Sequence, residues 1–219
     1  MRTLNSLGLP FTVLLLLAAS LAGQAGAQDV VPLNAKVIRL TGAAHYSVAG
    51  KPWQMLKVGD VLPAGTLVQT AKTKSIVDIQ LGEGAGTDAN AVRLLDDTAL
   101  EIKKLTGTGA GADRIEEIEL DLRAGQVLGV VKKFKDGSSY QIMLPTGAAG
   151  ISGEVSDIKG TVYVLKPSGA LAVLAGKVAI AIAAENTVAQ IVGADQQFDP
   201  ATGQVTKLAP DAPERKLWR

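Results

Sequence analysis

Short runs in which apolar and polar residues alternate recur along most of the chain. "SIVDIQL" (75–81) places three apolar side chains on one side and two polar ones on the other, and "IELDL" (118–122) and "YQIML" (140–144) repeat this arrangement. A period of two over such short runs is typical of half-buried β-strands, and the many β-branched residues favour the same structure. The pattern therefore predicts a mainly β protein.

Turn-forming residues separate these runs. Examples are "PAG" (63–65) and "KPSG" (166–169). "KKFKDGSSYQIM" (132–143) predicts a β-hairpin with Asp-Gly at its tip. Helix signals are scarce: the best candidate, "DDTALEIKKL" (96–105), fits a strand equally well.

The number of strands limits the architecture. About 14 short strands in one chain indicate a sandwich, a barrel or a solenoid. We predict a single mainly β domain with many short strands, arranged as a β-solenoid or a sandwich-like fold, with little helix.

A short internal similarity links three places in the sequence. "LRAGQV" (122–127) resembles "VLAGKV" (173–178), and "TGQV" (202–205) repeats its end. In each place a glycine precedes the expected start of a strand, where its backbone freedom suits a turn. The three places follow no fixed period, so they indicate recurrent turn chemistry more than a regular repeat.

The stretch "LPTGAAGISGEVSDIKGTVYVL" (144–165) is rich in glycine and raises the question of a phosphate-binding loop. A dinucleotide loop requires G-x-G-x-x-G between a strand and a helix, so that the helix N-terminus faces the phosphates. Here Gly147, Gly150 and Gly153 are three residues apart, and Gly160 precedes the strand-like "TVYVL". We therefore interpret these glycines as bends between strands.

The N-terminal segment has the features of a secretory signal peptide. Arg2 is the only charged residue among the first 27, and the apolar run "FTVLLLLAASLA" (11–22) follows it. Ala25 and Ala27 form the small-x-small pattern of a signal-peptidase site, which predicts cleavage between Ala27 and Gln28. The run is shorter than the roughly 20 residues that span a bilayer, so an uncleaved anchor is the lesser alternative. We expect an exported protein, periplasmic or extracellular, without a membrane span after cleavage.

Charge and cysteine content narrow the function classes. The chain has 22 basic and 21 acidic residues, and removal of Arg2 with the signal leaves equal numbers. This balance gives no electrostatic reason to expect nucleic acid or an anionic membrane as a partner. The chain contains no cysteine, which excludes disulfides, thiolate metal sites and cysteine nucleophiles.

The sequence offers few residues for chemistry. His45 is the only histidine, and nothing near it has the spacing of metal ligands. There is no G-x-S-x-G nucleophile elbow. Trp53 and Tyr46 could form a surface that stacks on a sugar, although packing is the preferred role for them. We predict a non-enzymatic protein with no catalytic, metal-binding or cofactor-binding residues and no cofactor.

Several pieces of the chain resemble the FecR-like domain family, named for the ferric-citrate regulator. "DIKGTVYVL" (157–165), with "GAAGISGEV" (147–155) before it, is similar to the family's core motif with its I-R-G-T element. "VGDVLPAGTLVQTAKTKSIVDIQL" (58–81) is similar to an upstream family segment, and further pieces follow in the family's order over residues 36–198. Leu144 departs from the family's usual Thr, and either "ISGE" or "IKGT" fills the I-R-G-T element. The positions that match the family's motifs and are expected to be structural are Gly59, Gly65, Thr70, Gly125, Pro145, Gly153, Gly160, Thr161 and Gly176.

The resemblance implies a mainly β extracytoplasmic domain that makes protein contacts. Together with the N-terminal signal, it leads us to divide the chain into a signal peptide (1–27), a FecR-like β domain (28–205) and a C-terminal tail (206–219). Regulators of the family also carry an anti-sigma segment and a membrane helix, and we expect neither here. Two functions stay open: an exported protein-interaction, envelope-scaffolding or signalling module with an unidentified protein partner, or a carbohydrate- or ligand-binding module around Trp53 and Tyr46.

Overall fold

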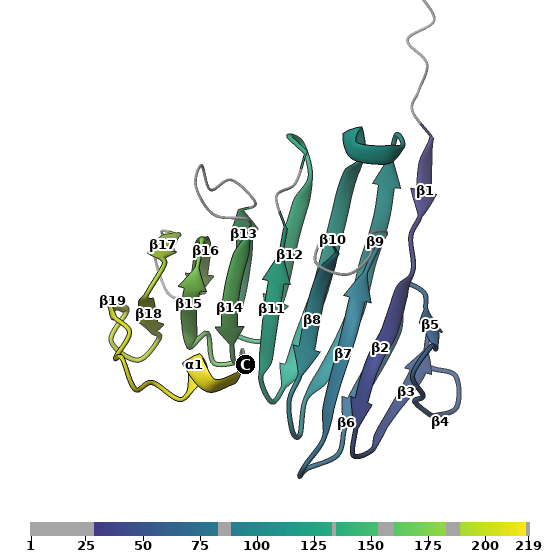
Figure 1. Cartoon of the computed structure of the whole chain (residues 1–219), viewed down its shortest axis with the longest axis horizontal. Helices are drawn as coiled ribbons and strands as arrows, with labels where there is room; N and C mark the ends of the chain where they lie inside the picture. The colour runs from purple at the N-terminus through teal and green to yellow at the C-terminus, as the bar shows by residue number, and fades with distance from the viewer. Residues whose placement is uncertain (1–28, 83–88, 133–134, 153–159, 183–188, 218–219) are drawn as a thin grey trace, which may run out of the picture.

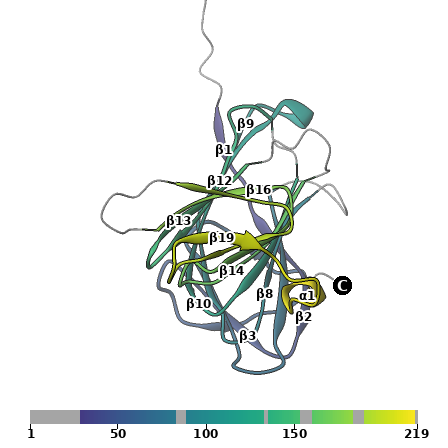
Figure 2. The same cartoon turned by 90° about the vertical axis from the view of Figure 1, so that its left-hand side faces the viewer.

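The computed structural model describes residues 29–82, 89–132, 135–152, 160–182 and 189–217. Within these residues the chain forms two β-sheets that pack face to face, as the two views show (Figure 1 and Figure 2). In this part of the chain, helix is confined to α1 (Glu214–Leu217) and one 3-10 turn (Gly111–Asp113). The structure confirms the prediction of a mainly β, sandwich-like fold with little helix.

The strands divide between the sheets in small groups along the chain. Sheet A contains β1 (Val30–Pro32), β3 (Ala44–Val48), β4 (Gln54–Met55), β6 (Thr66–Thr70), β9 (Ala99–Thr108), β10 (Ile115–Ala124), β12 (Ser139–Leu144), β13 (Gly147–Ser152), β16 (Lys177–Ile182) and β17 (Gln190–Gly193). Sheet B contains β2 (Ala35–Thr41), β5 (Val61–Leu62), β7 (Ile76–Leu81), β8 (Asn90–Leu94), β11 (Val127–Val131), β14 (Thr161–Leu165), β15 (Leu171–Ala175), β18 (Gln196–Asp199) and β19 (Gln204–Lys207).

The order of strands in each sheet follows the chain closely. Sheet A runs β4-β3-β6-β9-β10-β12-β13-β16-β17, with β1 pairing with β9, and sheet B runs β5-β2-β7-β8-β11-β14-β15-β18-β19. Paired strands are antiparallel except for β10 and β12. The sandwich therefore advances along its long axis from the purple strands to the yellow ones (Figure 1). The sequence left solenoid and sandwich open, and the structure is a sandwich with the linear progression of a solenoid.

The core lies between the two sheets and contains the apolar side of each alternating run. Ile118, Leu120 and Leu122 of β10 are almost completely buried, whereas the intervening acidic residues face outward. β7 and β12 follow the same alternation. Burying each such side chain contributes about 1.5–3 kcal/mol, so the sum over both sheets is the main stabilising term of a fold without disulfides.

Two tyrosines meet in the middle of this core. The hydroxyl of Tyr163 on β14 donates to the hydroxyl of Tyr140 on β12 at 3.0 Å, and the two rings pack edge to face. The Tyr163 ring lies against Gly129 of β11, where an added Cβ would stand about 2.1 Å from the ring. Because the two hydroxyls bind each other, each sheet buries a polar group that keeps a hydrogen-bond partner.

Several of the corners at which the chain passes between the sheets contain a glycine. Gly125, between β10 and β11, has a φ of +80°, and a Cβ there would lie 2.4 Å from Oγ1 of Thr98. The next residue, Gln126, donates its backbone N–H to the same Oγ1 at 3.1 Å. Thr98 itself lies at the neighbouring corner, between β8 and β9. The corner at Gly125 is therefore held by the hydroxyl of Thr98, which belongs to the neighbouring corner.

The same arrangement occurs at two more corners. A Cβ on Gly176 would lie 2.2 Å from Oγ1 of Thr161, and a Cβ on Gly42 would lie 2.6 Å from Oγ of Ser75. In both, the residue after the glycine donates its N–H to that hydroxyl. The similarity between "LRAGQV" and "VLAGKV" therefore has a physical cause: each supplies the glycine of such a corner. The third place, "TGQV", also has a glycine at positive φ before a strand, although Gly203 has no atom within 4 Å of its Cβ position.

Two local predictions are resolved by the structure. Residues 96–105, which fitted helix and strand equally, belong to the long strand β9 and the turn before it. The predicted hairpin at 132–143 is wrong, because β11 before the Asp-Gly turn lies in sheet B whereas β12 after it lies in sheet A. The turn connects the two layers, and β12 pairs with β10 and β13 instead.

The stretch of closely spaced glycines is only partly made of bends. Gly147 and Gly150 lie within strand β13, and Gly150 has ordinary space around it. Gly160 has a φ of +138°, and a Cβ there would stand 2.3 Å from the carbonyl oxygen of Val131. Gly153 lies outside the described residues.

The C-terminal residues fold back onto the outer face of sheet B. β19 extends to Lys207, and the segment after it buries Leu208 and Ala212 against Leu128, Val164 and Ala172 of β11, β14 and β15. The segment that the sequence assigned to a tail thus forms a second, smaller apolar cluster outside the main core.

Candidate functional site

A hollow of about 630 Å³ lies on the outer face of sheet A, near the end formed by β4. Its floor contains Ser47, Leu67 and Glu101, which are neighbours in register on β3, β6 and β9. Because side chains alternate between the two faces of a sheet, residues in register project on the same side. Arg123, at the end of β10, closes the floor.

The loop between β3 and β4 forms one wall of this hollow. Its backbone is tightly held: Ala49 donates to the carbonyl of Gly65 at 2.8 Å, and Ser47 Oγ donates to the carbonyl of Lys51. Ala49 has a φ of +48°, an unfavourable conformation for a residue with a Cβ. The loop positions Trp53 beside the hollow with its side chain half exposed.

Paired charges occupy the part of the floor that β9 and β10 supply. Arg123 donates through Nε to Asp121 at 3.0 Å and through Nη2 to Glu101, and Lys103 lies 3.7 Å from Glu101. The hydrogen bond to Asp121 is the main reason that the pKa of Arg123 is raised above its usual value. The guanidinium is therefore fixed in position, and the charges in this network balance.

The two aromatic residues that the sequence suggested as a sugar platform do not share a surface. Tyr46 packs against the main core, and its hydroxyl donates to Oε1 of Gln54 at 3.3 Å. Trp53 lies outside the sandwich, at the hollow. His45 is exposed on β3, opposite Met55. In the part of the chain that the structure describes, no group of three His, Cys, Asp or Glu residues is arranged to hold a metal ion.

The end of the sandwich beside this hollow is apolar. The segment from β4 to β5 buries Leu56 and Leu62 in the core but exposes Met55, Val58 and Val61 to about 60%. Its turn has Gly59 at a φ of +94°, and the Gly59 N–H donates to the carbonyl of Val37 at 2.8 Å. We call the surface made by Trp53, Met55, Val58 and Val61 the apolar end.

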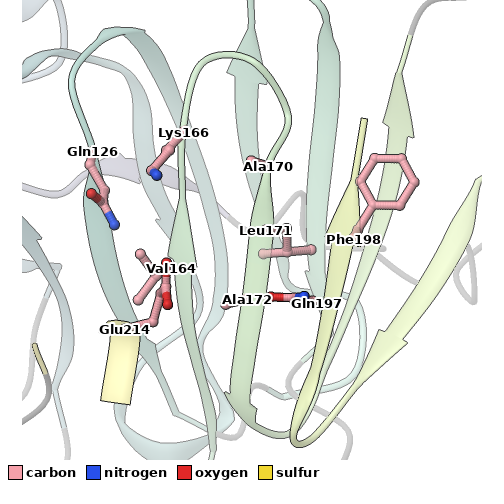
Figure 3. A pocket seen from close by; sticks show the side chains of 9 residues that line it. All are labelled: Gln126, Val164, Lys166, Ala170, Leu171, Ala172, Gln197, Phe198 and Glu214. Carbon is pink, nitrogen blue, oxygen red and sulfur yellow. The ribbon is translucent and has the colours of Figure 1, made fainter. Parts of the chain in front are cut away.

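A second, much smaller cavity lies on the outer face of sheet B, beside α1 (Figure 3). Its volume is about 70 Å³, which is room for no more than a few water molecules. The lining combines an apolar base with polar groups from separate elements, including Lys166 after β14 and Glu214 of α1. This cavity lies where Glu214 of the folded-back C-terminal segment meets sheet B.

The residues that match the family's motifs lie at turns and corners spread along the sandwich. Gly59 and Gly65, both at positive φ, lie near the apolar end, and Gly65 also lines the hollow. Thr70 supports a corner, where its hydroxyl donates to the carbonyl of Leu95 at 2.6 Å and accepts from the Thr98 N–H at 2.9 Å. These residues are structural in the sense that they shape the backbone.

The remaining described motif residues also lie at turns and corners. Thr161 and Gly176, 15 positions apart in the sequence, meet at one corner, and Gly125 has its own hydroxyl partner at another. Pro145 lies in the short turn between β12 and β13. Gly153, like the cleavage residues Ala27 and Gln28, lies outside the described residues. The motif therefore does not assemble a single binding site.

Sequence reasoning missed most of the residues around the hollow. The sequence singled out neither Glu101, within "DDTALEIKKL" (96–105), nor Arg123, within "LRAGQV" (122–127), because their pairing depends on the register of β9 and β10. For the apolar end, the sequence does contain a pattern that could have indicated an exposed apolar surface. "PWQMLKVGDV" (52–61) contains large apolar residues at a spacing that fits neither a strand nor a helix.

Comparison with protein-family models, with curated proteins and with solved structures found no match to this chain. In the described residues no helix has the length and apolar character needed to cross a membrane.

Proposed function

We propose that this chain is an exported, non-catalytic FecR-like module that binds a protein partner of the cell envelope through its apolar end. The observation that carries the proposal is the clustering of Trp53, Met55, Val58 and Val61 on one short segment at the end of the sandwich. Exposed large apolar side chains that gather on one part of a protein surface mark interaction sites. They are costly to leave in water, and a partner that covers them gains their burial.

The partner would contact side chains more than backbone. β4 and β5 form the ends of their sheets, and each is only two residues long. So short an edge offers few free N–H and C=O groups for strand addition. Pro52 and Pro63, beside these strands, cannot donate to a sheet. We therefore expect an apolar, well-packed contact with a complementary protein surface.

The proposal also uses the signal-like N-terminal segment and the ordered resemblance to the FecR-like family. It predicts that the mature species begins at Gln28. Intact-mass measurement on protein from the native host tests this, and a mature chain that still begins at Met1 would contradict export by cleavage.

A paired comparison tests the interaction. The mature domain (28–219) carrying Met55→Ser and Val58→Ser is compared with wild type as bait in envelope extract. The matched control is Ile191→Ser, because Ile191 is as exposed as Val58 but lies on β17 at the other end of the sandwich. We expect wild type and control to retain the same partner in equal amounts. The double variant should retain at least tenfold less of that partner. Equal retention by all three would show that the apolar end is not the interface.

The hollow beside Trp53 favours a second function, binding of a carbohydrate or another small ligand. It cannot use Trp53 and Tyr46 together, since Tyr46 packs into the core. The residues that the structure offers instead are Trp53, Glu101 and Arg123.

A further inference from the structure

We propose that the hollow beside Trp53 binds a neutral saccharide, with Trp53 stacking on one face of the sugar ring and Glu101 and Arg123 hydrogen-bonding to its hydroxyls. The inference deepens the second function above; the saccharide site shares Trp53 with the apolar end but does not require the protein contact there. It rests on the shape, the polarity and the charge of the hollow.

The shape suits a small ligand. The volume of about 630 Å³ falls within the range of roughly 300–1,000 Å³ that is usual for small-molecule sites. The floor is three neighbouring strands of one sheet, and the wall is a loop fixed by backbone hydrogen bonds. The site is therefore formed before any ligand arrives, which lowers the cost of binding.

The lining combines apolar and polar surface, with the apolar part on the loop and at the centre of the floor. Trp53, Pro52 and Leu67 supply apolar surface, whereas Ser47, Glu101 and Arg123 supply donors and acceptors. A pyranose ring has the same division, because its C–H groups gather on its faces and its hydroxyls on its rim. A half-exposed indole covers such a face well, since it offers a large rigid surface.

The charged floor favours hydroxyls over ions, although the exposed Lys51 of the loop also lines the hollow. Arg123 already binds Asp121 and Glu101, and Glu101 also has Lys103 nearby. An anionic ligand would compete with two carboxylates for the guanidinium, and a cationic ligand would compete with Arg123 for Glu101. A hydroxyl can donate to the carboxylate and accept from the guanidinium without separating the pair, because it does both at once.

The test measures binding to the mature chain (28–219) carrying Trp218→Phe, which leaves Trp53 as its only tryptophan. The probes are maltotriose, cellotriose and triacetylchitotriose, up to 10 mM, followed by tryptophan fluorescence and by calorimetry. We expect at least one of them to bind saturably and to change the Trp53 emission. Absence of binding by all three would overturn the proposal.

Variants locate the site and separate it from the apolar end. Trp53→Ala and Glu101→Gln should each weaken binding of the active probe at least tenfold in calorimetry. Ile191→Ala, on β17 at the other end of sheet A, should leave it unchanged. The Met55→Ser and Val58→Ser variant should also bind the saccharide normally, so a failed protein contact and a failed saccharide site give different results.

Two further outcomes would overturn the inference. Binding that is unaffected by Trp53→Ala would place the saccharide elsewhere. Tighter binding of sodium phosphate or of a sulfated trisaccharide than of any neutral probe would show that the site selects anions.

Discussion

At the residue scale, the corner glycines separate two physical effects that usually occur together. A glycine at positive φ avoids the strain that a Cβ would cause, and a glycine in a tight contact avoids a clash. Gly59 and Gly125 both have positive φ, at +94° and +80°. Only Gly125 has atoms close to the Cβ position, with Thr98 at 2.4 Å, whereas Gly59 has none within 4 Å.

We therefore expect unequal losses from the same substitution. Gly59→Ala should lower the free energy of unfolding by about 1 kcal/mol, the cost of the backbone conformation. Gly125→Ala should lower it by roughly 2–4 kcal/mol, because overpacking adds about 1–3 kcal/mol. Urea unfolding of both variants checks this. Losses of the same size would mean that the contact with Thr98 relaxes freely and that the corner is not a packed unit.

The buried tyrosine pair makes stability depend on pH above the usual tyrosine pKa. Burial raises the pKa of both Tyr140 and Tyr163 in the folded state. In the unfolded chain tyrosine ionises near pH 10. Below that pH both states hold the protons, so the stabilisation is fully present. Above it only the unfolded chain releases them, and stability falls by about 1.4 kcal/mol per pH unit for each tyrosine.

Lysines also titrate near this pH, so a variant is needed to isolate the contribution of the buried tyrosines to the loss of stability. Tyr163→Phe removes one of the two groups, so between pH 10 and 11 its stability should fall by about 1 kcal/mol less than that of wild type. Urea unfolding at closely spaced pH values gives both slopes. Parallel slopes would contradict the burial of an un-ionised Tyr163 in the folded state.

At the element scale, alternation predicted the strands and their inward faces but not their partners. The inward sides of β7, β10 and β12 follow directly from period two. The sheet to which a strand belongs is decided by the corner before it, and the hydroxyl that supports a corner is about 15–33 residues away in the sequence. The failed hairpin at 132–143 shows the consequence: a sequence signal for a turn does not say whether the chain stays in one sheet or crosses to the other.

The candidate site depends even more on register. Glu101 and Asp121 are neighbours because of the pairing of β9 with β10, which shifts at an irregularity between Glu119 and Leu120. A shift of one residue turns a side chain to the other face, so no local pattern could place Arg123 beside Glu101. Trp53 was identified from its type alone, and its separation from Tyr46 followed only from the structure.

The segment that folds back on sheet B allows a prediction of its own. Leu208 is completely buried, although it follows the last strand of the sandwich. Leu208→Ala should cost about 2–3 kcal/mol, because it removes buried methyl groups and leaves a gap over Val164. Val58→Ala, at an exposed position, should change stability by less than about 0.5 kcal/mol. A negligible loss from Leu208→Ala in thermal or urea unfolding would show that this segment is not docked in solution.

At the scale of the whole molecule, the sandwich has two ends of different character. One end is closed by the very short strands β4 and β5 and is apolar. The other end is formed by β17 and β19, which are four residues each. Sheets without a covered edge risk pairing with other chains, and short edge strands reduce that risk. An end that offers apolar side chains but little free backbone is suited to a selective contact.

The linear order of strands also predicts how the molecule opens. Each strand contacts mainly its neighbours along the axis, so the ends can open without the middle. β9 and β10, at the centre of sheet A, are ten residues long, and the inward side chains of β10 are almost completely buried. Native-state hydrogen exchange should therefore be slowest in β9, β10 and β11, where exchange requires global unfolding. In β4, β5, β17 and β19 it should be faster by orders of magnitude and nearly independent of low urea concentrations. Uniform protection from end to end, with the same urea dependence everywhere, would mean that the sandwich unfolds as one cooperative unit despite its linear construction.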